Sequence, residues 1–579
     1  MHWICTVRAN PALALFLRAN AQTTALAVTL LYKTSVCTNA VQYTYGIAIE
    51  CTKLGVNEMG LSLVQSRALL GLQATAVTVE VHLANGLPSF TLVGLADVEV
   101  KEARERVRCA IQNSNLQFPH NQRITVNLAP ADLPKDSGRL DLPIALGILA
   151  ASGQIDGARL AGYEFAGELS LSGELRPVRG ALATALALHT SQVQTRLVLP
   201  PDSAEEAALV PDSQVYRARH LLDVVRQFAP LDAAQGASSD EGSPMEDGWA
   251  RVLPATTMTP AYRPDMADVK GHAGAKRALE IAAAGGHSLL LVGPPGSGKS
   301  MLAHRFAGLL PPMSNDEALQ SAAISSLCGR FSMDQWGQRP TCSPHHSASA
   351  VALVGGGSPP RPGEISLAHH GVLFLDEMPE FPRAALEALR EPLETGCITI
   401  ARAAQRSEFP ARFQLVGAMN PCPCGFFGST IHACRCTPDQ IHRYQAKLSG
   451  PLMDRIDLHI EVPALPSAEL LGAAPGEATE PIRLRSTVAR QRALDRQGCS
   501  NMALQGQSID QHVRLDSDAV KFLNVAATRM GWSARSTHRA LKVARTIADL
   551  AGAEHTQISH LAEAMQYRRT TARPGKDGR

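Results

Sequence analysis

The segment at residues 293–300, Gly-Pro-Pro-Gly-Ser-Gly-Lys-Ser, constrains the fold of this chain more than any other. It directly follows the apolar run Ser288–Val292 and directly precedes a stretch with helical character. A strand, a glycine loop, Lys-Ser and a helix in this order form the phosphate-binding P-loop. The glycines let backbone N–H groups close around an anionic phosphate, and the helix N-terminus adds partial positive charge. The segment therefore predicts an α/β core that binds a nucleotide.

The residues of this loop are assigned to the nucleotide site. Lys299 is predicted to reach the β- and γ-phosphates, and Ser300 is predicted to hold Mg²⁺. ATP and Mg²⁺ are therefore the expected cofactors. The predicted cofactor-binding residues of the loop are Gly293, Pro294, Pro295, Gly296, Ser297, Gly298, Lys299 and Ser300.

An acidic motif follows in the segment Val372–Glu377. Four apolar residues end in two carboxylates, which is typical of a buried parallel strand that delivers acids at its carboxyl edge. Asp376 is expected to bind Mg²⁺ through water, and Glu377 is expected to polarise the attacking water. Phosphoryl transfer needs little covalent chemistry from the protein, so the metal, the water-positioning group and cations supply most of the catalysis.

Asn420 ends another short apolar run, Leu415–Asn420. It fits a catalytic sensor that contacts the γ-phosphate or the attacking water. An asparagine that caps a turn before Pro421 is the alternative, and taken in isolation the residue favours it.

Arg455 lies between Asp454 and Asp457, just before a strand predicted at Leu458–Val462. A surface ion pair is one interpretation, and such pairs are usually worth less than ~1 kcal/mol. The other is a catalytic finger that reaches the ATP of a neighbouring subunit, where loss of the arginine commonly costs ~10³ in rate. Arg535, in the helix predicted at Ser533–Leu550, is the expected second sensor in a lid. Arg539, one turn later, competes for that role.

The length and charge of the chain limit the kinds of protein that it can be. At 579 residues it is too long for one hydrophobic core, so roughly two to four domains are expected. The net charge of +2 excludes a uniformly basic nucleic-acid-binding chain, so contacts with DNA or RNA must come from local patches or from a ring of subunits. The most apolar stretch, 12–32, is interrupted by Arg18, Asn20 and Gln22, so neither a membrane span nor a signal sequence is expected, and we place the protein in the cytoplasm.

Local patterns divide the chain into segments. A strand at Ala76–His82, a helix at Val98–Asn113 and a strand at Arg123–Leu128 predict a mixed α+β region, and a helical hairpin is expected at 517–567. The residues between 231 and 250 have linker composition. The expected segments are a non-native or disordered extension (1–58), an α+β domain (59–230), a linker (231–250), the ATPase domain (251–466), an α-helical lid (467–569) and a basic tail (570–579).

Four of the twelve cysteines form a cluster with the spacing C-x-C, nine residues, C-x-C. Four thiolates in two tight pairs can bind Zn²⁺ tetrahedrally and hold together a loop that has little hydrophobic core. Free thiols and a redox-labile pair remain open as alternatives. The candidate zinc ligands are Cys422, Cys424, Cys434 and Cys436.

The order of these motifs resembles the magnesium-chelatase-like branch of the AAA+ ATPases. Three segments resemble the YifB/ComM family within that branch: 343–349 (Ser-Pro-His-His-Ser-Ala-Ser), 362–371 (Pro-Gly-Glu-Ile-Ser-Leu-Ala-His-His-Gly) and 420–425 (Asn-Pro-Cys-Pro-Cys-Gly). The resemblance begins at Met59, which suggests that Met59 is the true start of the protein. It implies an ATP-driven homohexameric ring that acts on branched or single-stranded DNA, as a branch-migration helicase in recombination during natural transformation.

A hairpin is expected at 396–409, with Arg402 and Arg406 near its tip. In the wider AAA+ group, a hairpin before the first sensor faces the pore of the ring. Arginines there can hold phosphates without reading sequence. A solvated hairpin that happens to carry two arginines is equally compatible with the residues.

The segments 134–143 and 167–180 resemble the fold of Lon proteases, which use a Ser/Lys dyad. Arg139 stands at the position of the family's nucleophile, and Leu182 stands at the position of its lysine. Ser137 and Lys135 lie nearby but do not recreate the geometry of the dyad. We therefore expect a Lon-protease-like fold without protease chemistry, and a Lon-like protease remains an alternative.

Two further functions share parts of this pattern. A chelatase-type motor, which inserts Mg²⁺ into a porphyrin, uses the same ATPase core. This function needs partner subunits, and it does not explain the cysteine cluster. A non-enzymatic assembly factor is hard to reconcile with a full set of ATPase residues.

Overall fold

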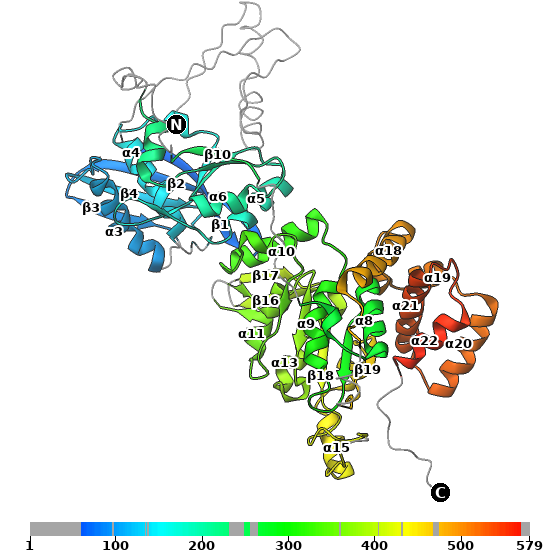
Figure 1. The fold of residues 1–579 in the computed structure, drawn as a ribbon. Coiled ribbons are helices and arrows are strands. Elements are labelled where there is room, and N and C mark those ends of the chain that lie inside the picture. The colour runs from blue at the N-terminus through cyan, green and yellow to red at the C-terminus, as the bar shows by residue number, and fades with distance from the viewer. Residues whose placement is uncertain are drawn as a thin grey trace, which may run out of the picture. The chain divides into compact units, whose positions relative to one another are not determined.

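The computed structural model describes most of the chain from Gly60 onward (Figure 1). The described residues are 60–94, 98–131, 133, 135, 138–230, 248–254, 264–357, 360–402, 405–429, 432–466 and 474–568. The segments 1–58 and 570–579, most of the predicted linker and Ser137 lie outside these residues, so the expectations for them stay predictions.

An eight-stranded mixed sheet spans the described residues from Leu61 to Val252, in the order β10-β9-β8-β5-β1-β2-β4-β3. Its strands are β1 (Leu61–Leu70), β2 (Gln73–Asn85), β3 (Ser89–Val93), β4 (Gln122–Ala129), β5 (Tyr163–Phe165), β8 (Arg196–Leu199), β9 (Gln214–Arg217) and β10 (Ala250–Val252). The associated helices are α3 (Val98–Asn113), α4 (Asp141–Ala151), α5 (Ala181–Thr190), α6 (Pro201–Ala207) and α7 (Leu221–Gln227).

Alternation of side chains explains why β2 forms where it does. Val77, Val79 and Val81 are fully buried on one face of the strand, and α4 packs against β1 and β2. The predicted strand at 76–82 lies within β2, and the predicted helix at 98–113 has the bounds of α3. β4 contains the third predicted element with one extra residue at each end. The pattern of apolar residues therefore predicts these two strands and this helix correctly.

A five-stranded parallel sheet forms the second layered unit, in the order β12-β15-β18-β11-β19 among the described residues. Its strands are β11 (Leu289–Val292), β12 (Thr341–Cys342), β15 (Val372–Leu375), β18 (Gln414–Met419) and β19 (Leu458–Glu461). The helices of this region are α8 (Ala273–Gly285), α9 (Lys299–Leu309), α10 (Asn315–Leu327), α11 (Ala350–Val354), α12 (Glu364–Leu367), α13 (Arg383–Glu387), α14 (Pro392–Thr395), α15 (Pro438–Gln445) and α16 (Gly450–Met453). Two short hairpins, β13–β14 (Gly355–Gly356, Arg361–Pro362) and β16–β17 (Cys397–Arg402, Gln405–Pro410), accompany them.

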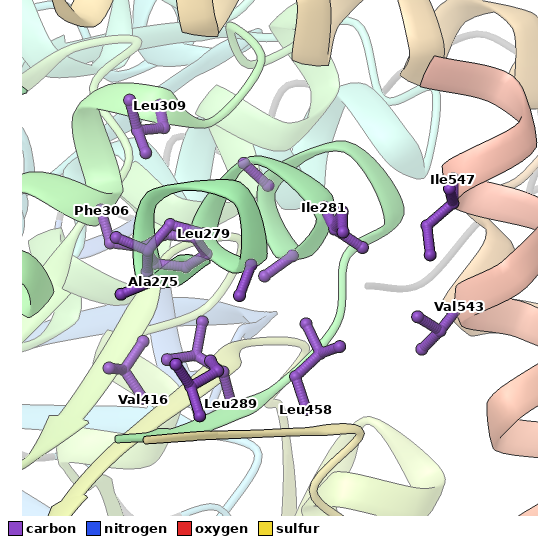
Figure 2. Packing of buried hydrophobic residues seen from close by; sticks show 14 of the residues in the cluster. Ala275, Leu279, Ile281, Leu289, Phe306, Leu309, Val416, Leu458, Val543 and Ile547 are labelled. Carbon is purple, nitrogen blue, oxygen red and sulfur yellow. The ribbon is translucent and has the colours of Figure 1, made fainter. Parts of the chain in front are cut away.

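Both faces of the parallel sheet are covered. Leu289 and Leu291 belong to one hydrophobic core, whereas Leu290 and Val292, the alternate residues of the same strand, belong to another. The continuous apolar run of β11 follows from this two-sided burial. Figure 2 shows the first core, in which residues of α8, α9 and α21 lie beside the strands: Leu279, Ile281, Phe306, Leu309, Leu289, Val416, Leu458, Val543 and Ile547.

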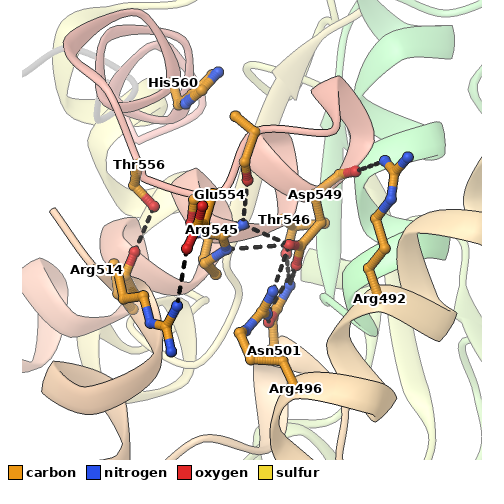
Figure 3. Close-up of polar contacts among 12 residues, drawn as sticks. Arg492, Arg496, Asn501, Arg514, Arg545, Thr546, Asp549, Glu554, Thr556 and His560 are labelled. Atoms are coloured by element: carbon orange, nitrogen blue, oxygen red, sulfur yellow. Dashed lines mark hydrogen bonds and ion pairs between the residues drawn. The ribbon is translucent and has the colours of Figure 1, made fainter. Parts of the chain in front are cut away.

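The C-terminal region is helical, with α18 (Thr479–Gln497), α19 (Gln507–Val513), α20 (Ser517–Met530), α21 (Ala534–Ala551) and α22 (Ile558–Gln566). The expectation of a single helical hairpin at 517–567 is wrong, because Gly531 and Gly552, both at positive φ, end α20 and α21 and divide the segment into three helices. A buried polar network joins α18 to α21 (Figure 3). In it, Asp549 accepts hydrogen bonds from Arg496, Asn501 and Arg545.

The helix α10 shares a hydrophobic core with α5 and α6. Leu319 and Ala323 of α10 are buried in the same cluster as Leu182 of α5. Beside this core, the Ser326 hydroxyl donates to Glu206 of α6 at 2.7 Å. Burial raises the pKa of Glu206 to about 7, although the hydrogen bond from Ser326 opposes this change.

Candidate active site

Three neighbouring parallel strands end at one edge of the sheet, and each is followed by predicted site residues. β18 lies between β15 and β11, and all three run in the same direction. The carboxyl ends of parallel strands are where α/β folds bind ligands. The sheet therefore brings together the P-loop after β11, the acidic pair Asp376–Glu377 after β15 and Asn420 after β18.

The P-loop lies between β11 and α9, and its glycines are needed where they stand. A Cβ atom at Gly293 would lie 2.1 Å from the carbonyl oxygen of Val462, so no larger residue fits. Gly296 and Gly298 adopt positive φ angles of 75° and 86°, which glycine reaches without strain. The buried hydroxyl of Ser297 has no partner among the described residues, which leaves it available to a ligand in the loop.

Lys299 begins α9, and its ammonium group lies inside the loop. Its Nζ donates to the carbonyl oxygens of Gly293 and Pro294, both at 2.9 Å, and to Oδ1 of Asn420 at 3.1 Å. Burial lowers the pKa of Lys299, and the charges of Asp376 and Glu377 oppose this effect. The side chain of Asn420 thus faces the P-loop lysine, the position that a sensor needs.

Ser300 and Asp376 form the metal side of the site. The Ser300 hydroxyl donates to Oδ2 of Asp376 at 2.6 Å. A hydroxyl and a carboxylate so close together offer the oxygen ligands that Mg²⁺ prefers, together with waters and phosphate oxygens. When bound, Mg²⁺ would neutralise charge on the β- and γ-phosphates. These residues fit the predicted Mg²⁺-ATP.

Glu377 follows Asp376 directly and has a left-handed backbone conformation. Its φ angle is 50°, its backbone N–H donates to Oδ1 of Asp376 at 2.9 Å, and its side chain is 57% exposed. Oε2 of Glu377 lies 3.3 Å from Nδ1 of His346. Nothing near Glu377 in the sequence indicates this contact. It arises because β12 pairs with β15, which places the residues after Cys342 beside those after Leu375.

Arg455 is buried and does form an ion pair, but with a partner that its neighbours in the sequence do not indicate. Its guanidinium donates to the Pro451 carbonyl at 2.6 Å and lies 2.7 Å from Oε1 of Glu394. Neither of its sequence neighbours Asp454 and Asp457 is its ion-pair partner in the described residues. The partner comes instead from α14.

Arg535 and Arg539, the two candidates for the second sensor, differ in their surroundings. Arg539 is buried and donates to Oδ1 of Asp457 and to the carbonyl of Arg455, both at 2.7 Å. Arg535 is 58% exposed, and its Nη2 lies 3.3 Å from Oε1 of Glu394. Arg539 therefore serves the packing of α21, and Arg535 is the arginine available to a ligand.

Arg455 lies at the other edge of the sheet from the P-loop of its own chain. β11 and β19 are parallel, with Leu289 opposite Leu458. The P-loop follows the last residue of β11, whereas Arg455 precedes the first residue of β19. Strands of this length separate the two edges by about 10 Å or more.

The β16–β17 hairpin places Arg406 opposite Ala401, and the side chain of Arg406 is exposed. Arg402 is paired through its backbone with Gln405. The side chain of Arg402 lies outside the described residues, so its predicted contact with DNA stays a prediction.

The four cysteines converge in one loop after β18. The Sγ atoms of Cys422, Cys424 and Cys434 lie 3.4–3.7 Å apart, and those of all four cysteines lie within 4.8 Å of one another. A tetrahedral Zn²⁺ with bonds of about 2.3 Å to sulfur has S–S edges of about 3.8 Å, so the cluster fits this ion. The loop touches the P-loop, because a Cβ at Gly425 would lie 2.5 Å from Cδ of Pro295.

The residues at the Lon dyad positions are engaged in packing. Arg139 is buried and donates to the carbonyl of Arg179 at 2.6 Å, and Leu182 lies in the hydrophobic core around α5. Lys135 is also buried and donates to the carbonyl of Pro130. Neither Arg139 nor Leu182 supplies a nucleophile or a base.

Comparison with known families identifies three matches in order along the chain. "Subunit ChlI of Mg-chelatase" matches residues 79–203, "Magnesium chelatase, subunit ChlI" matches 265–470, and its C-terminal family matches 476–568. The match to this family points to an ATPase that uses ATP and Mg²⁺, which agrees with the residues of the site described above. Of the helices that the structure describes, none combines the length and apolar character needed to cross a membrane.

Curated relatives match most of this chain over nearly the whole of their own length. Competence protein ComM of Haemophilus influenzae is 48% identical over 512 residues, which is 88% of this chain and 98% of the relative. The uncharacterized protein YifB of Escherichia coli is 47% identical over 515 residues, 88% of this chain and 97% of its own length. An uncharacterized protein of Mycobacterium tuberculosis is 41% identical over 522 residues, 89% of this chain and all of its own. The chain therefore belongs to the YifB/ComM family of magnesium-chelatase-like AAA+ ATPases.

Proposed function

We propose that this chain forms a homohexameric ring that uses Mg²⁺-ATP to move branched or single-stranded DNA, as a branch-migration helicase in recombination. Natural transformation is the proposed setting, because one relative is named a competence protein. In this proposal Lys299, Ser300, Asp376 and Glu377 bind and hydrolyse ATP in one subunit, with Asn420 as sensor. Arg455 and Arg535 of the neighbouring subunit complete the site.

The position of Arg455 is the observation that supports the proposed ring. An arginine that stabilises the transition state must reach the γ-phosphate. Arg455 instead lies at the edge of the sheet opposite its own P-loop, and among the described residues it contacts Pro451 and Glu394. A second subunit whose P-loop meets this edge supplies the missing phosphate. The relation is head-to-tail, the kind of contact that forms a ring when the rotation between subunits closes.

DNA is the partner proposed for the pore of this ring. The exposed Arg406 of the β16–β17 hairpin, repeated in every subunit, supplies a circle of cations that needs no base contacts. A chain with a net charge of +2 can bind DNA only through such local concentration of charge.

The test measures ATP turnover with and without DNA, together with migration of a four-way junction. We expect branched or single-stranded DNA to stimulate turnover, and Lys299→Ala to abolish it. Combined Arg402→Ala and Arg406→Ala should remove the stimulation and leave basal turnover unchanged. Arg383→Ala, at an exposed arginine of α13, is the matched control. ATP turnover that is indifferent to DNA would contradict the proposal.

A chelatase-type motor is the second candidate, since all three matched families carry that name. It predicts turnover that depends on partner subunits and a porphyrin rather than on DNA. We also propose that residues 59–230 have a Lon-protease-like fold without protease activity, since Arg139 and Leu182 occupy the dyad positions. The ATPase domain at 251–466 and the lid at 467–569 complete the proposed organisation.

A further inference from the structure

One carboxylate oxygen holds two arginines that come from distant parts of the chain. Nη2 of Arg455 lies 2.7 Å from Oε1 of Glu394, and Nη2 of Arg535 lies 3.3 Å from the same oxygen. Arg455 precedes β19, Arg535 lies in the first turn of α21, and Glu394 belongs to α14. The hydrogen bond from Arg455 lowers the pKa of Glu394, which favours its ionised form.

The two guanidinium groups need an anion to stay together. Like charges at this separation repel, and the repulsion is stronger near a protein surface than in bulk water. Arg535 is exposed and has a long flexible side chain, so its contact with Glu394 restricts where its charge lies. Arg455 is held on its other side by the Pro451 carbonyl, while its buried Nε has no partner in the described part of the chain. The cluster therefore presents two cations together, with one donor still unused.

Glu394 is also tied to the hairpin that carries Arg406. The hydroxyl of Thr395 accepts a hydrogen bond from the backbone N–H of Cys397 at 3.3 Å and donates to the carbonyl of Glu391 at 3.0 Å. Gly396, at a φ of 72°, makes the turn between α14 and β16, and a Cβ there would lie 2.9 Å from Cγ of Arg412. Gly396 is thus the one residue between α14 and β16, and the hydrogen bonds of Thr395 hold the two elements together at this junction.

We propose that Glu394 is a positioning residue, which holds Arg455 and Arg535 together for the ATP of the neighbouring subunit and links them to the β16–β17 hairpin. The inference rests on the proposed ring. In this proposal Glu394 connects DNA binding to ATP hydrolysis without contacting either the DNA or the ATP.

The first test compares Glu394→Gln, which keeps the shape and removes the charge, with Glu391→Gln in the residue just before the same helix. A misplacement of about 1 Å can cost about 100-fold in rate. We expect Glu394→Gln to lower kcat about tenfold or more, to change KM for ATP less than twofold and to lose most of the stimulation by DNA. Its midpoint of thermal unfolding should match that of Glu391→Gln. Wild-type or higher kcat in Glu394→Gln would overturn the inference.

The second test uses mixed rings to separate the inference from the proposed function. Subunits with Lys299→Ala cannot use ATP, but they can still offer Arg455 to the ATP site of a neighbour. Subunits with Arg455→Ala can bind ATP, but they offer no arginine to a neighbour. We expect a mixture of the two to regain turnover. Glu394→Gln added to the Lys299→Ala subunit should abolish this recovery, whereas the same change in the Arg455→Ala subunit should not.

The possible outcomes of the mixing experiment have separate meanings. A mixture that regains no turnover would reject the proposed arrangement of arginines between subunits, and with it the role of Glu394. Recovery that is unaffected by Glu394→Gln in the arginine-donating subunit would reject the role of Glu394 alone. If wild-type turnover is not stimulated by DNA, the proposed DNA motor fails, but the expected effects on kcat and on the mixture stand.

Discussion

The hydroxyl of Ser300 donates to Oδ2 of Asp376 at 2.6 Å, which joins the P-loop to the end of β15. This contact connects the residue that is expected to bind Mg²⁺ directly with the residue that is expected to bind it through water. The two motifs therefore predict ligands of the same Mg²⁺ site. The role of each residue can be tested by the dependence of ATP turnover on Mg²⁺ concentration.

Ser300→Ala should raise the Mg²⁺ concentration needed for half-maximal ATP turnover about tenfold or more, because groups that orient a metal typically contribute 10–100-fold to its affinity. Turnover at saturating ATP, measured across a series of Mg²⁺ concentrations, checks this. Ser332→Ala is the control, since it removes an exposed hydroxyl that lies outside the nucleotide loop and donates to Asp334. An unchanged Mg²⁺ dependence in Ser300→Ala would contradict the assignment.

Glu377→Gln should lower turnover by at least about 100-fold while ATP binding persists, because the amide cannot take a proton from the attacking water. Binding of a fluorescent ATP analogue and gel filtration with ATP check this, and we expect a stabilised ring. Glu380→Gln, in the same turn and paired with Lys447, is the matched control. A variant that stays monomeric with ATP bound would contradict the ring.

Arg539→Ala should destabilise the fold, whereas Arg535→Ala should mainly reduce activity. Asp457 is fully buried, and burial alone would raise its pKa, but His287 and Arg539 hold the pKa below its usual range. Removing one member of a buried ion pair costs about 3–5 kcal/mol. Chemical denaturation should show this loss for Arg539→Ala and a change within about 0.5 kcal/mol for Arg535→Ala.

The purified protein should contain about one Zn²⁺ per chain. Cys424→Ser should lose most of this metal and lower the midpoint of thermal unfolding, because metal binding contributes directly to folding of such loops. Metal analysis by mass spectrometry checks this, and Cys499→Ser, outside the cluster, should keep its zinc. Metal-free protein in which all thiols react freely would exclude the zinc site.

The stability contributed by Glu206 should depend on pH. Its pKa is raised by burial from 4.5 to about 7, so the folded chain holds a proton that the unfolded chain has released between these values. This contribution is complete below about pH 4.5 and is lost as the pH rises through 7. Unfolding midpoints at pH 5 and pH 8 should therefore differ less for Glu206→Gln than for the wild type. The exposed neighbour Glu205→Gln should follow the wild type.

The core of the site could be predicted because its signals are local. The runs before Gly293, Asp376 and Asn420 are continuous apolar strands, and β11, β15 and β18 appear there. A parallel sheet with both faces covered requires such runs, and its carboxyl edge collects the polar residues that follow. The helix predicted at Ser533–Leu550 likewise differs from α21 by one residue at each end.

The partners of these residues could not be predicted, because they depend on the order of strands and on long-range packing. Nothing near Glu394 in the sequence indicates Arg455 or Arg535. The two carboxylates beside Arg455 suggested the wrong partners, since Asp457 is occupied by Arg539. His346 reaches Glu377 only because β12 is added beside β15.

The close approach of Gly425 to Pro295 gives the cysteine loop and the nucleotide loop a common boundary. Coupling between two binding sites is reciprocal: a free energy that one ligand adds to the affinity of the other is returned equally. Whatever a metal held by the cysteines contributes to ATP affinity, ATP must therefore contribute to retention of the metal. If the metal strengthens ATP binding, the protein without nucleotide releases this metal more readily than the ATP-bound protein does.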